Sequence, residues 1–197
     1  MRLRIAAVVV ALAAVLVTSA SATSQKAVKL KTGDVVGVTG THIACIAATS
    51  SGKRGIACLL LANGKPVANS YGALLLVDGT AVVSKLKANG SSQDLFARKP
   101  QSATRAAKVT EVGPNDVFGF VISSKLQIGC KVQNVTAKSI PALFRGIRVT
   151  CWRATAASKP VGRSYFTSIS DKFVVVAQFD AKGNVTSSAP LVNKSQP

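Results

Sequence analysis

Features of residues 33–90 recur in the same order in residues 115–183. GDVVGV at 33–38 corresponds to NDVFGF at 115–120, an Ile-x-Cys tripeptide follows in each copy, and a second cysteine comes later. A repeated sequence pattern encodes a repeated supersecondary unit, so the duplication limits the architectures that the chain can adopt. We predict a first unit at 23–90, a linker at 91–114, and a second unit with a C-terminal tail at 115–197.

A second shared motif, KPVANSYG at 65–72 and KPVGRSYF at 159–166, is identical at five of eight positions. In both copies a tyrosine, Tyr71 or Tyr165, begins a predicted strand and follows a lysine by six residues. A tyrosine at such a place can bury its ring and bond its hydroxyl to the backbone, which pins a turn. We interpret this motif as structural.

Within each unit the sequence predicts β-strands. Short runs rich in Val, Ile, Leu and Phe are separated every eight to twelve residues by turn-forming Gly, Asn, Asp or Pro. The linker instead predicts a short helix near 92–99, which Pro100 would end. The fold class is therefore all-β, with about five strands in each unit of a pseudo-twofold pair, built as adjacent small domains or as one sandwich or barrel with a shared core. The clearest strands are predicted at 35–38, 42–47, 56–61, 71–77, 81–86 and 173–179.

The four cysteines fit the duplicated plan, because each unit holds one pair. The repeat predicts the disulfides Cys45–Cys58 and Cys130–Cys151 out of three possible pairings. A zinc site made of all four thiolates is the alternative, but structural zinc sites use closely spaced pairs such as C-x2-C, which are absent from this sequence. We predict no metal and no cofactor.

Residues 1–22 have the pattern of a cleavable secretory signal peptide. Arg2 and Arg4 precede thirteen uncharged apolar residues at 5–17, and the small residues at 20–22 fit a cleavage site after Ala22. Thirteen residues are too few to cross the roughly 30 Å of hydrocarbon in a bilayer comfortably, although residues 18–22 could lengthen the stretch into an uncleaved anchor. We expect a signal helix, export to the envelope or the extracellular space, and no transmembrane span in the mature chain.

The chain is strongly basic. Without Arg2 and Arg4, 23 of the 25 basic residues remain against seven acidic ones, a formal charge of +16. Such a charge predicts attraction to an anionic cell-wall polymer or membrane surface. Nucleic acid is not expected as the specific partner, because single-strand binders interleave several aromatic residues with their basic ones, and in this part of the chain only Trp152 qualifies.

The second unit is the best candidate for recognition of an anion. No acidic residue occurs between Asp116 and Asp171, whereas eight basic residues do. In a strand, Arg148, Thr150 and Trp152 share one face, so an exposed arginine and indole could bind an anionic polymer or sugar. The alternative is a tryptophan packed on a second sheet or on the disulfide. The candidate contact residues are Lys131, Arg148, Trp152, Arg153 and Arg163.

Catalytic residues are scarce, since the chain has one histidine and seven acidic residues. A Ser-His-Asp site that uses His42 and Asp34 can be drawn, but Ser70 and Ser164 belong to the repeated motif, and neither lies in a nucleophile elbow. We therefore predict a protein without enzymatic activity, and a secreted hydrolase or an enzyme inhibitor as the alternative.

The order of an Ile-x-Cys, a second cysteine and a Ser-Tyr-Gly strand resembles a pattern of small exported proteins of actinobacterial type. The resemblance covers residues 33–90 and, with Phe166 in place of the glycine, residues 115–183. It implies a bacterial exported protein with a disulfide-bearing β unit, and it implies no activity, ligand or catalytic residue.

Overall fold

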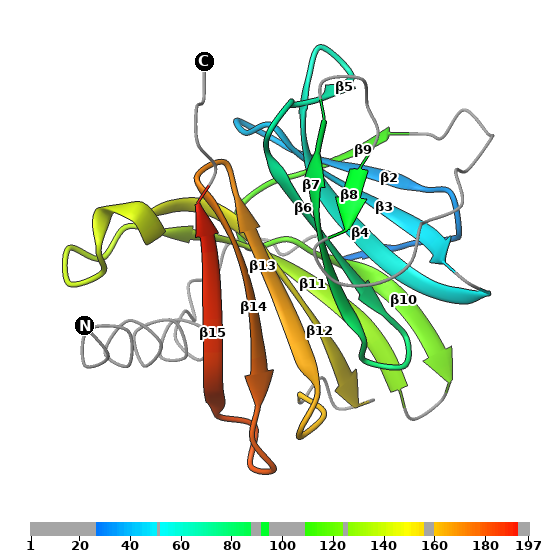
Figure 1. Ribbon diagram of the computed structural model, residues 1–197. Coiled ribbons are helices and arrows are strands. Elements are labelled where there is room, and N and C mark those ends of the chain that lie inside the picture. The colour runs from blue at the N-terminus through cyan, green and yellow to red at the C-terminus, as the bar shows by residue number, and fades with distance from the viewer. Residues whose placement is uncertain are drawn as a thin grey trace.

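The protein consists of two β-sheets, sheet A and sheet B (Figure 1). The computed structural model describes residues 27–50, 52–87, 92–94, 109–123, 126–155 and 160–192. Within these ranges the helical element is η1, a 3-10 helix at Ala142–Phe144. The prediction of an all-β fold is confirmed.

Sheet A has the strand order β1-β10-β11-β12-β13-β14-β15. Apart from β1, it is built from the second half of the chain as an antiparallel meander in which consecutive strands pair. Its strands are β1 (Ala27–Lys29), β10 (Val117–Ser123), β11 (Leu126–Val135), β12 (Gly146–Thr155), β13 (Tyr165–Ser170), β14 (Phe173–Phe179) and β15 (Val185–Val192).

Sheet B has the order β8-β7-β6-β4-β3-β2-β9, and the short strand β5 pairs with β4. Apart from β9, it comes from the first half of the chain and is also antiparallel between consecutive neighbours in the order. Its strands are β2 (Val35–Val38), β3 (Ile43–Ser50), β4 (Lys53–Ala62), β5 (Lys65–Pro66), β6 (Tyr71–Leu76), β7 (Ala81–Leu86), β8 (Ser92–Asp94) and β9 (Val109–Val112).

Each sheet ends in a parallel strand from the other half of the chain. β1 precedes the first unit but pairs with β10, and β9 precedes the second unit but pairs with β2. The chain therefore passes from sheet A to sheet B between β1 and β2, and returns between β9 and β10. These two crossings connect the halves more tightly than a simple linker would.

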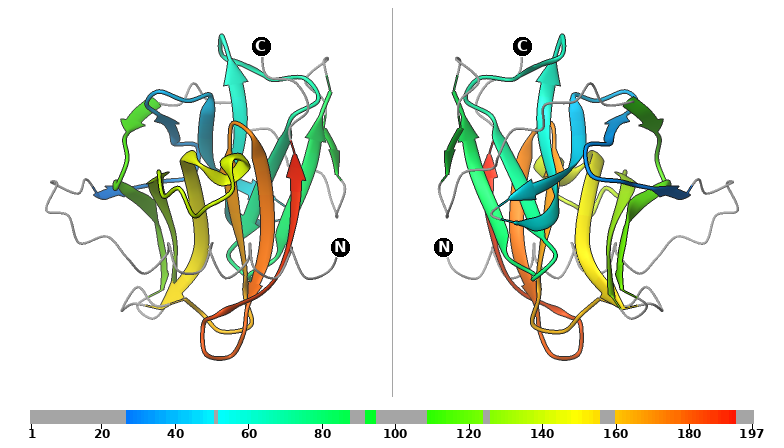
Figure 2. Two further views of the ribbon diagram at one scale, coloured as in Figure 1. Left: turned by 90° about the vertical axis from the view of Figure 1, so that its left-hand side faces the viewer. Right: turned by 90° about the vertical axis from the view of Figure 1, so that its right-hand side faces the viewer.

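The two sheets share one hydrophobic core, which we call the inner core. It contains both disulfides and buried residues of both sheets, and β6 of sheet B contacts β13 and β14 of sheet A. Both views in Figure 2 show the green strands of sheet B beside the orange strands of sheet A. Of the arrangements considered from the sequence, the shared core is the one found. Its residues include Val36, Ile43, Ile56, Leu60, Leu75, Phe118, Ile128, Val132, Val149 and Ile169.

Both predicted disulfides are confirmed. Cys45–Cys58 joins β3 to β4, and Cys130–Cys151 joins β11 to β12, in each case between residues that lie directly opposite one another. The sulfurs are bonded to one another, so the alternative of a tetrathiolate zinc site is wrong. Two disulfides fit an oxidising environment outside the cytoplasm.

The predicted strands are found where the apolar alternation is clear, and the prediction fails in the linker. The structure has strands at all six predicted places. Within 91–114, however, β8 replaces the start of the predicted helix, and β9 completes the edge of sheet B. The rest of the predicted helix lies outside the described residues, as does the predicted signal peptide. No helix in the described part of the chain is long and apolar enough to span a membrane.

The repeated motifs make matching local bonds. The carboxylate of Asp34 accepts a hydrogen bond from Lys31 N, and that of Asp116 accepts one from Gly113 N. The hydroxyl of Ser70 donates to Val67 O at 2.7 Å. Later in the chain, the hydroxyl of Ser164 donates to Val161 O at 2.6 Å. The serine therefore pins this turn, and the prediction of a buried tyrosine is wrong for Tyr165, which is 42% exposed.

Candidate functional site

The strand register brings three of the five candidate residues onto one face of sheet A. Lys131 on β11 lies opposite Thr150 on β12, and Gln133 lies opposite Arg148. Directly opposite residues share a face of the sheet, and so do alternate residues of one strand. Lys131, Arg148 and Trp152 therefore lie on the face that points away from the inner core, which we call the outer face of sheet A.

Arg148 is buried, and its predicted exposure is wrong: the residue is only 1% exposed. The reason is a second apolar cluster on the outer face, the outer cluster, which includes residues of β13, β14 and the η1 region. Within it the rings of Phe144 and Phe173 meet edge to face at 5.0 Å between centroids. The buried members of the outer cluster are Val135, Ile140, Phe144, Phe166, Phe173, Val175, Ala177 and Phe179.

Polar side chains form a chain of contacts beside Arg148, which we call the polar row. Arg148 Nε donates to Gln133 Oε1 at 3.3 Å. Thr150 Oγ1 donates to the same amide oxygen at 3.4 Å and lies 3.1 Å from Ser168 Oγ. All four residues are buried. The polar row therefore lies on the same face of sheet A as the outer cluster.

The guanidinium of Arg148 is incompletely satisfied. Its Nη1 atom is buried and has no hydrogen-bond partner, and no carboxylate of a described residue forms an ion pair with it. Burial lowers the pKa of Arg148 well below its ordinary value, to about 10, so the group stays charged at neutral pH. Burying an unpaired charge costs several kcal/mol, because protein groups do not replace the lost hydration.

Trp152 is half-buried and packs against the outer cluster. It is therefore packed, but on residues of its own sheet and of the η1 region, and not on a second sheet or on the disulfide. It lies opposite Phe166 on β13. Its indole Nε1 is buried and has no hydrogen-bond partner. Two donors on the outer face of β12, Arg148 Nη1 and Trp152 Nε1, therefore have no acceptor.

Arg153 faces the other way and connects the two sheets. Its Nη1 donates to the carbonyl oxygen of Asp78 at 3.1 Å, and a Cβ atom at Gly79 would lie 2.8 Å from the same nitrogen. The Asp78 carboxylate in turn pairs with Lys53 at 2.6 Å. This contact between the sheets accounts for the position of Arg153.

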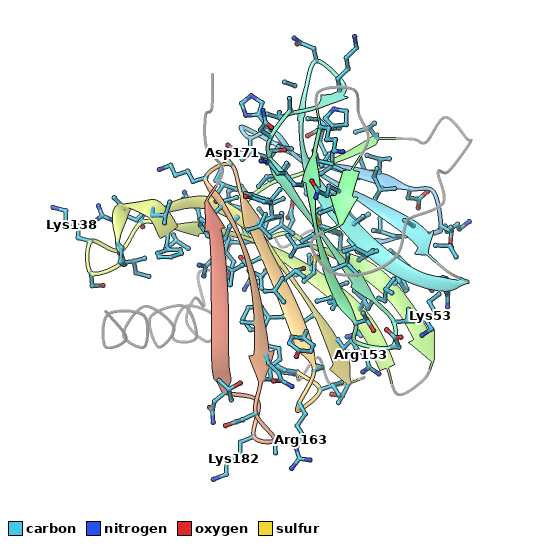
Figure 3. All side chains as sticks on the ribbon, in the orientation of Figure 1. Lys53, Lys138, Arg153, Arg163, Asp171 and Lys182 are labelled. Carbon is cyan, nitrogen blue, oxygen red and sulfur yellow. A yellow bond between two sulfur atoms is a disulfide. The ribbon has the colours of Figure 1, made fainter. Side chains whose placement is uncertain are left out.

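Arg163 is exposed in the turn before β13, with a φ of 58°. Figure 3 shows it beside Lys182 at one tip of sheet A, while Lys138 lies at a distant edge of the molecule. Arg163 is therefore separate from the outer-face group, and the five candidates do not form one site.

His42 does not form the Ser-His-Asp arrangement considered from the sequence. Its neighbour is Asp171, whose Oδ1 lies 3.7 Å from His42 Nδ1 and accepts a hydrogen bond from His42 N. The Asp34 carboxylate accepts a hydrogen bond within its own turn, and the hydroxyls of Ser70 and Ser164 each donate to a carbonyl oxygen three residues earlier. In the described residues no serine or threonine hydroxyl forms a hydrogen bond with the His42 ring, and no group of three or more potential metal ligands is found.

The sequence interpretation missed Gln133 and Ser168 and did not count Thr150 among the candidate contact residues, although the repeat contains a signal for these polar residues. Arg148 precedes Cys151 by three residues, as Gly55 precedes Cys58, so these two positions correspond in the two units. Thr150 and Ala57 correspond in the same way, since each directly precedes its cysteine. The strand pairing extends this correspondence, since Ala57 lies opposite Leu74 and Thr150 opposite Ser168. The polar row thus replaces small and apolar residues of the first unit, so the β unit itself does not require it.

No protein-family model, curated protein or solved structure matches this chain.

Proposed function

We propose that this chain acts outside the cytoplasm as a non-enzymatic protein that binds an anionic partner, either a membrane surface or a cell-wall polymer, through the outer face of sheet A. The observation that carries the proposal is the buried, unpaired guanidinium of Arg148. A buried positive charge is destabilising unless an anion pairs with it. The chain has no acidic residue between Asp116 and Asp171 to supply one.

The architecture is consistent with this proposal. Export follows from the signal-peptide pattern at 1–22 and agrees with the two disulfides. The shared motifs and the reciprocal pairing of β1 with β10 and β9 with β2 support a pseudo-twofold relation between the two units. In this proposal the second unit carries the anion-binding residue Arg148, and the first unit has small or apolar residues at the corresponding positions.

Vesicle sedimentation tests the proposal on protein recovered after export by expressing cells. We expect wild-type protein to bind vesicles that contain phosphatidylglycerol, to ignore pure phosphatidylcholine, and to retain binding in about 0.5 M NaCl, where the Debye length is well under 10 Å. Immobilised polyglutamate in place of the vesicles tests a polymer partner.

Arg148→Met and Arg163→Met are matched variants, because both remove one positive charge. Binding at high salt should be lost in Arg148→Met and kept in Arg163→Met. Equal loss in both variants, or complete release of the wild type from vesicles and polymer at high salt, would refute the proposal. Either result would show that the protein binds through its overall net charge and not through Arg148.

A secreted hydrolase is the second candidate, and the proximity of His42 to Asp171 is the observation that favours it. His42→Ala should abolish any hydrolytic activity that is detected with ester and peptide substrates. Activity that persists in this variant would eliminate the candidate.

A further inference from the structure

Both unpartnered donors on β12 lie on the same face of that strand. Among the described residues, three buried side-chain nitrogen or oxygen atoms have no hydrogen-bond partner, and they belong to Arg148, Trp152 and Arg153. Arg153 points to the opposite face, toward the Asp78 turn. The remaining two, Arg148 Nη1 and Trp152 Nε1, are four residues apart, which is roughly 13 Å along a strand.

The surroundings of the two donors differ in character. Beside Arg148 lie the polar row and, at a diagonal position, Lys131. Between the donors on β12 lies Thr150 of the polar row, with Lys131 and Ser168 directly opposite it. Beside Trp152 lie aromatic side chains of the outer cluster: Phe166 is directly opposite it, and the ring centroids of Phe166 and Phe179 are 4.7 Å apart. A group that satisfied both donors would have an anionic end, an apolar body and an acceptor oxygen farther along.

From this arrangement we propose that the outer face of sheet A binds one anionic amphiphile, a molecule with a carboxylate or phosphate at one end and a hydrocarbon chain that lies along β12. The planar guanidinium of Arg148 pairs with the anionic head, because its fork of N–H donors matches two oxygens of a carboxylate or phosphate. The indole of Trp152 covers the chain and donates to an acceptor near its far end. The proposal rests on the proposed function and names the ligand class of that same site.

The apolar surroundings favour an amphiphile over a charged polymer. A polymer with a charge on every unit would bring further anions against Phe166, Val175 and Ala177, all of which are buried on this face. Uncompensated burial of those anions would be unfavourable. An amphiphile presents one charge to one arginine and hydrocarbon to the remainder.

Entry of the ligand requires part of the shell around Arg148 to move, because this residue is 1% exposed. The outer cluster on this face includes Phe144 of η1, which contacts Phe173. Phe173 N donates to Ser170 Oγ, and Ser170 lies directly opposite Arg148. A displacement of η1 would therefore open the outer cluster next to the guanidinium.

Trp152 is the single tryptophan of the chain and reports directly on this face. Its fluorescence should respond, with saturation at one molecule per chain, to decanoate or to decyl phosphate in 0.5 M NaCl. These two probes distinguish a carboxylate head from a phosphate head. Decanol, which lacks the charge, and acetate, which lacks the chain, should each bind at least tenfold more weakly than decanoate.

Variants assign the two ends of the ligand. Arg148→Met should weaken binding of the charged probes at least tenfold, and Arg163→Met should leave it within twofold. Arg148→Lys keeps the charge without the fork and should give an intermediate affinity. By calorimetry, 10-hydroxydecanoate should bind more tightly than decanoate to the wild type, and Trp152→Phe should remove this advantage.

Equal binding of decanol and decanoate, or unchanged binding by both Arg148 variants, would overturn the assignment of Arg148 as the anchor. If Arg148-dependent binding is seen with vesicles or polyglutamate but not with the single-chain probes, the ligand class is wrong and the proposed function stands. If no anion binds in an Arg148-dependent way, both fail.

Discussion

Replacing Arg148 by methionine should stabilise the ligand-free protein. Burial lowers the pKa of Arg148 from its ordinary value to about 10, which corresponds to about 3 kcal/mol of penalty for the charged form, since a tenfold change in a protonation equilibrium is worth about 1.4 kcal/mol. Methionine has a similar length and no charge. It forfeits the hydrogen bond from Nε to Gln133, a loss of about 1–2 kcal/mol.

The net expectation is a gain of about 1–2 kcal/mol in the free energy of unfolding. For a chain of this size that corresponds to a rise of about 2–8 °C in Tm. Urea unfolding without reductant, on protein stripped of bound lipid, measures the difference, and Arg163→Met should change stability by less than about 0.5 kcal/mol.

The pH dependence of this gain follows from the sign of the pKa change. The folded pKa lies below the unfolded one, so the penalty is fully present at pH values below about 10 and is relieved only as the pH rises further. The difference between Arg148→Met and wild type should therefore be constant from pH 5 to pH 9. A variant destabilised by 2 kcal/mol or more would refute the argument, because it would show that the guanidinium is already satisfied in the folded chain.

Three other changes test the fold. Cys130→Ser with Cys151→Ser should lower the free energy of unfolding by about 3 kcal/mol in non-reducing urea titrations, since the bridge closes a loop of sequence separation 21; an unchanged midpoint would contradict this. Gly79→Ala should destabilise the fold by about 1–3 kcal/mol, because φ is +90° and the new Cβ would meet Arg153, and Arg153→Ala in the same chain should recover part of the loss. Burial raises the pKa of Asp78, but hydrogen bonds from Lys53 and Thr80 outweigh it and lower the pKa to about 2. Its stabilising contribution is therefore present above pH 4 and lost as the pH falls through 2, so thermal melts of Asp78→Asn and wild type should differ at pH 7 and converge near pH 2.

The elements that could be predicted from the sequence are those encoded locally. Alternating apolar residues located β2, β7 and β14 at their observed bounds, and the repeat selected the correct disulfides. The edge strand β9 was missed because its register depends on parallel pairing with β2, more than seventy residues earlier in the chain. Such distant pairing leaves no period in the local sequence.

The candidate site was predicted in part. Strand alternation correctly placed Arg148, Thr150 and Trp152 on one face, and it left open whether the arginine and indole on that face are exposed or the tryptophan is packed. Exposure is wrong for Arg148, because the outer cluster, with Phe144 from η1 and Phe173 from β14, covers that face. Whether apolar side chains cover a face of a sheet depends on tertiary packing. The alternation of residues along one strand does not reveal what packs on either face.

Native mass spectrometry of the protein recovered after export tests the role of Arg148 most directly. We expect wild-type protein to carry one small anionic molecule per chain, released by organic solvent. Arg148→Met should be recovered without it, while Arg163→Met should retain it. Recovery of the wild type free of any such molecule, or of an equal load on Arg148→Met, would show that Arg148 does not hold a ligand.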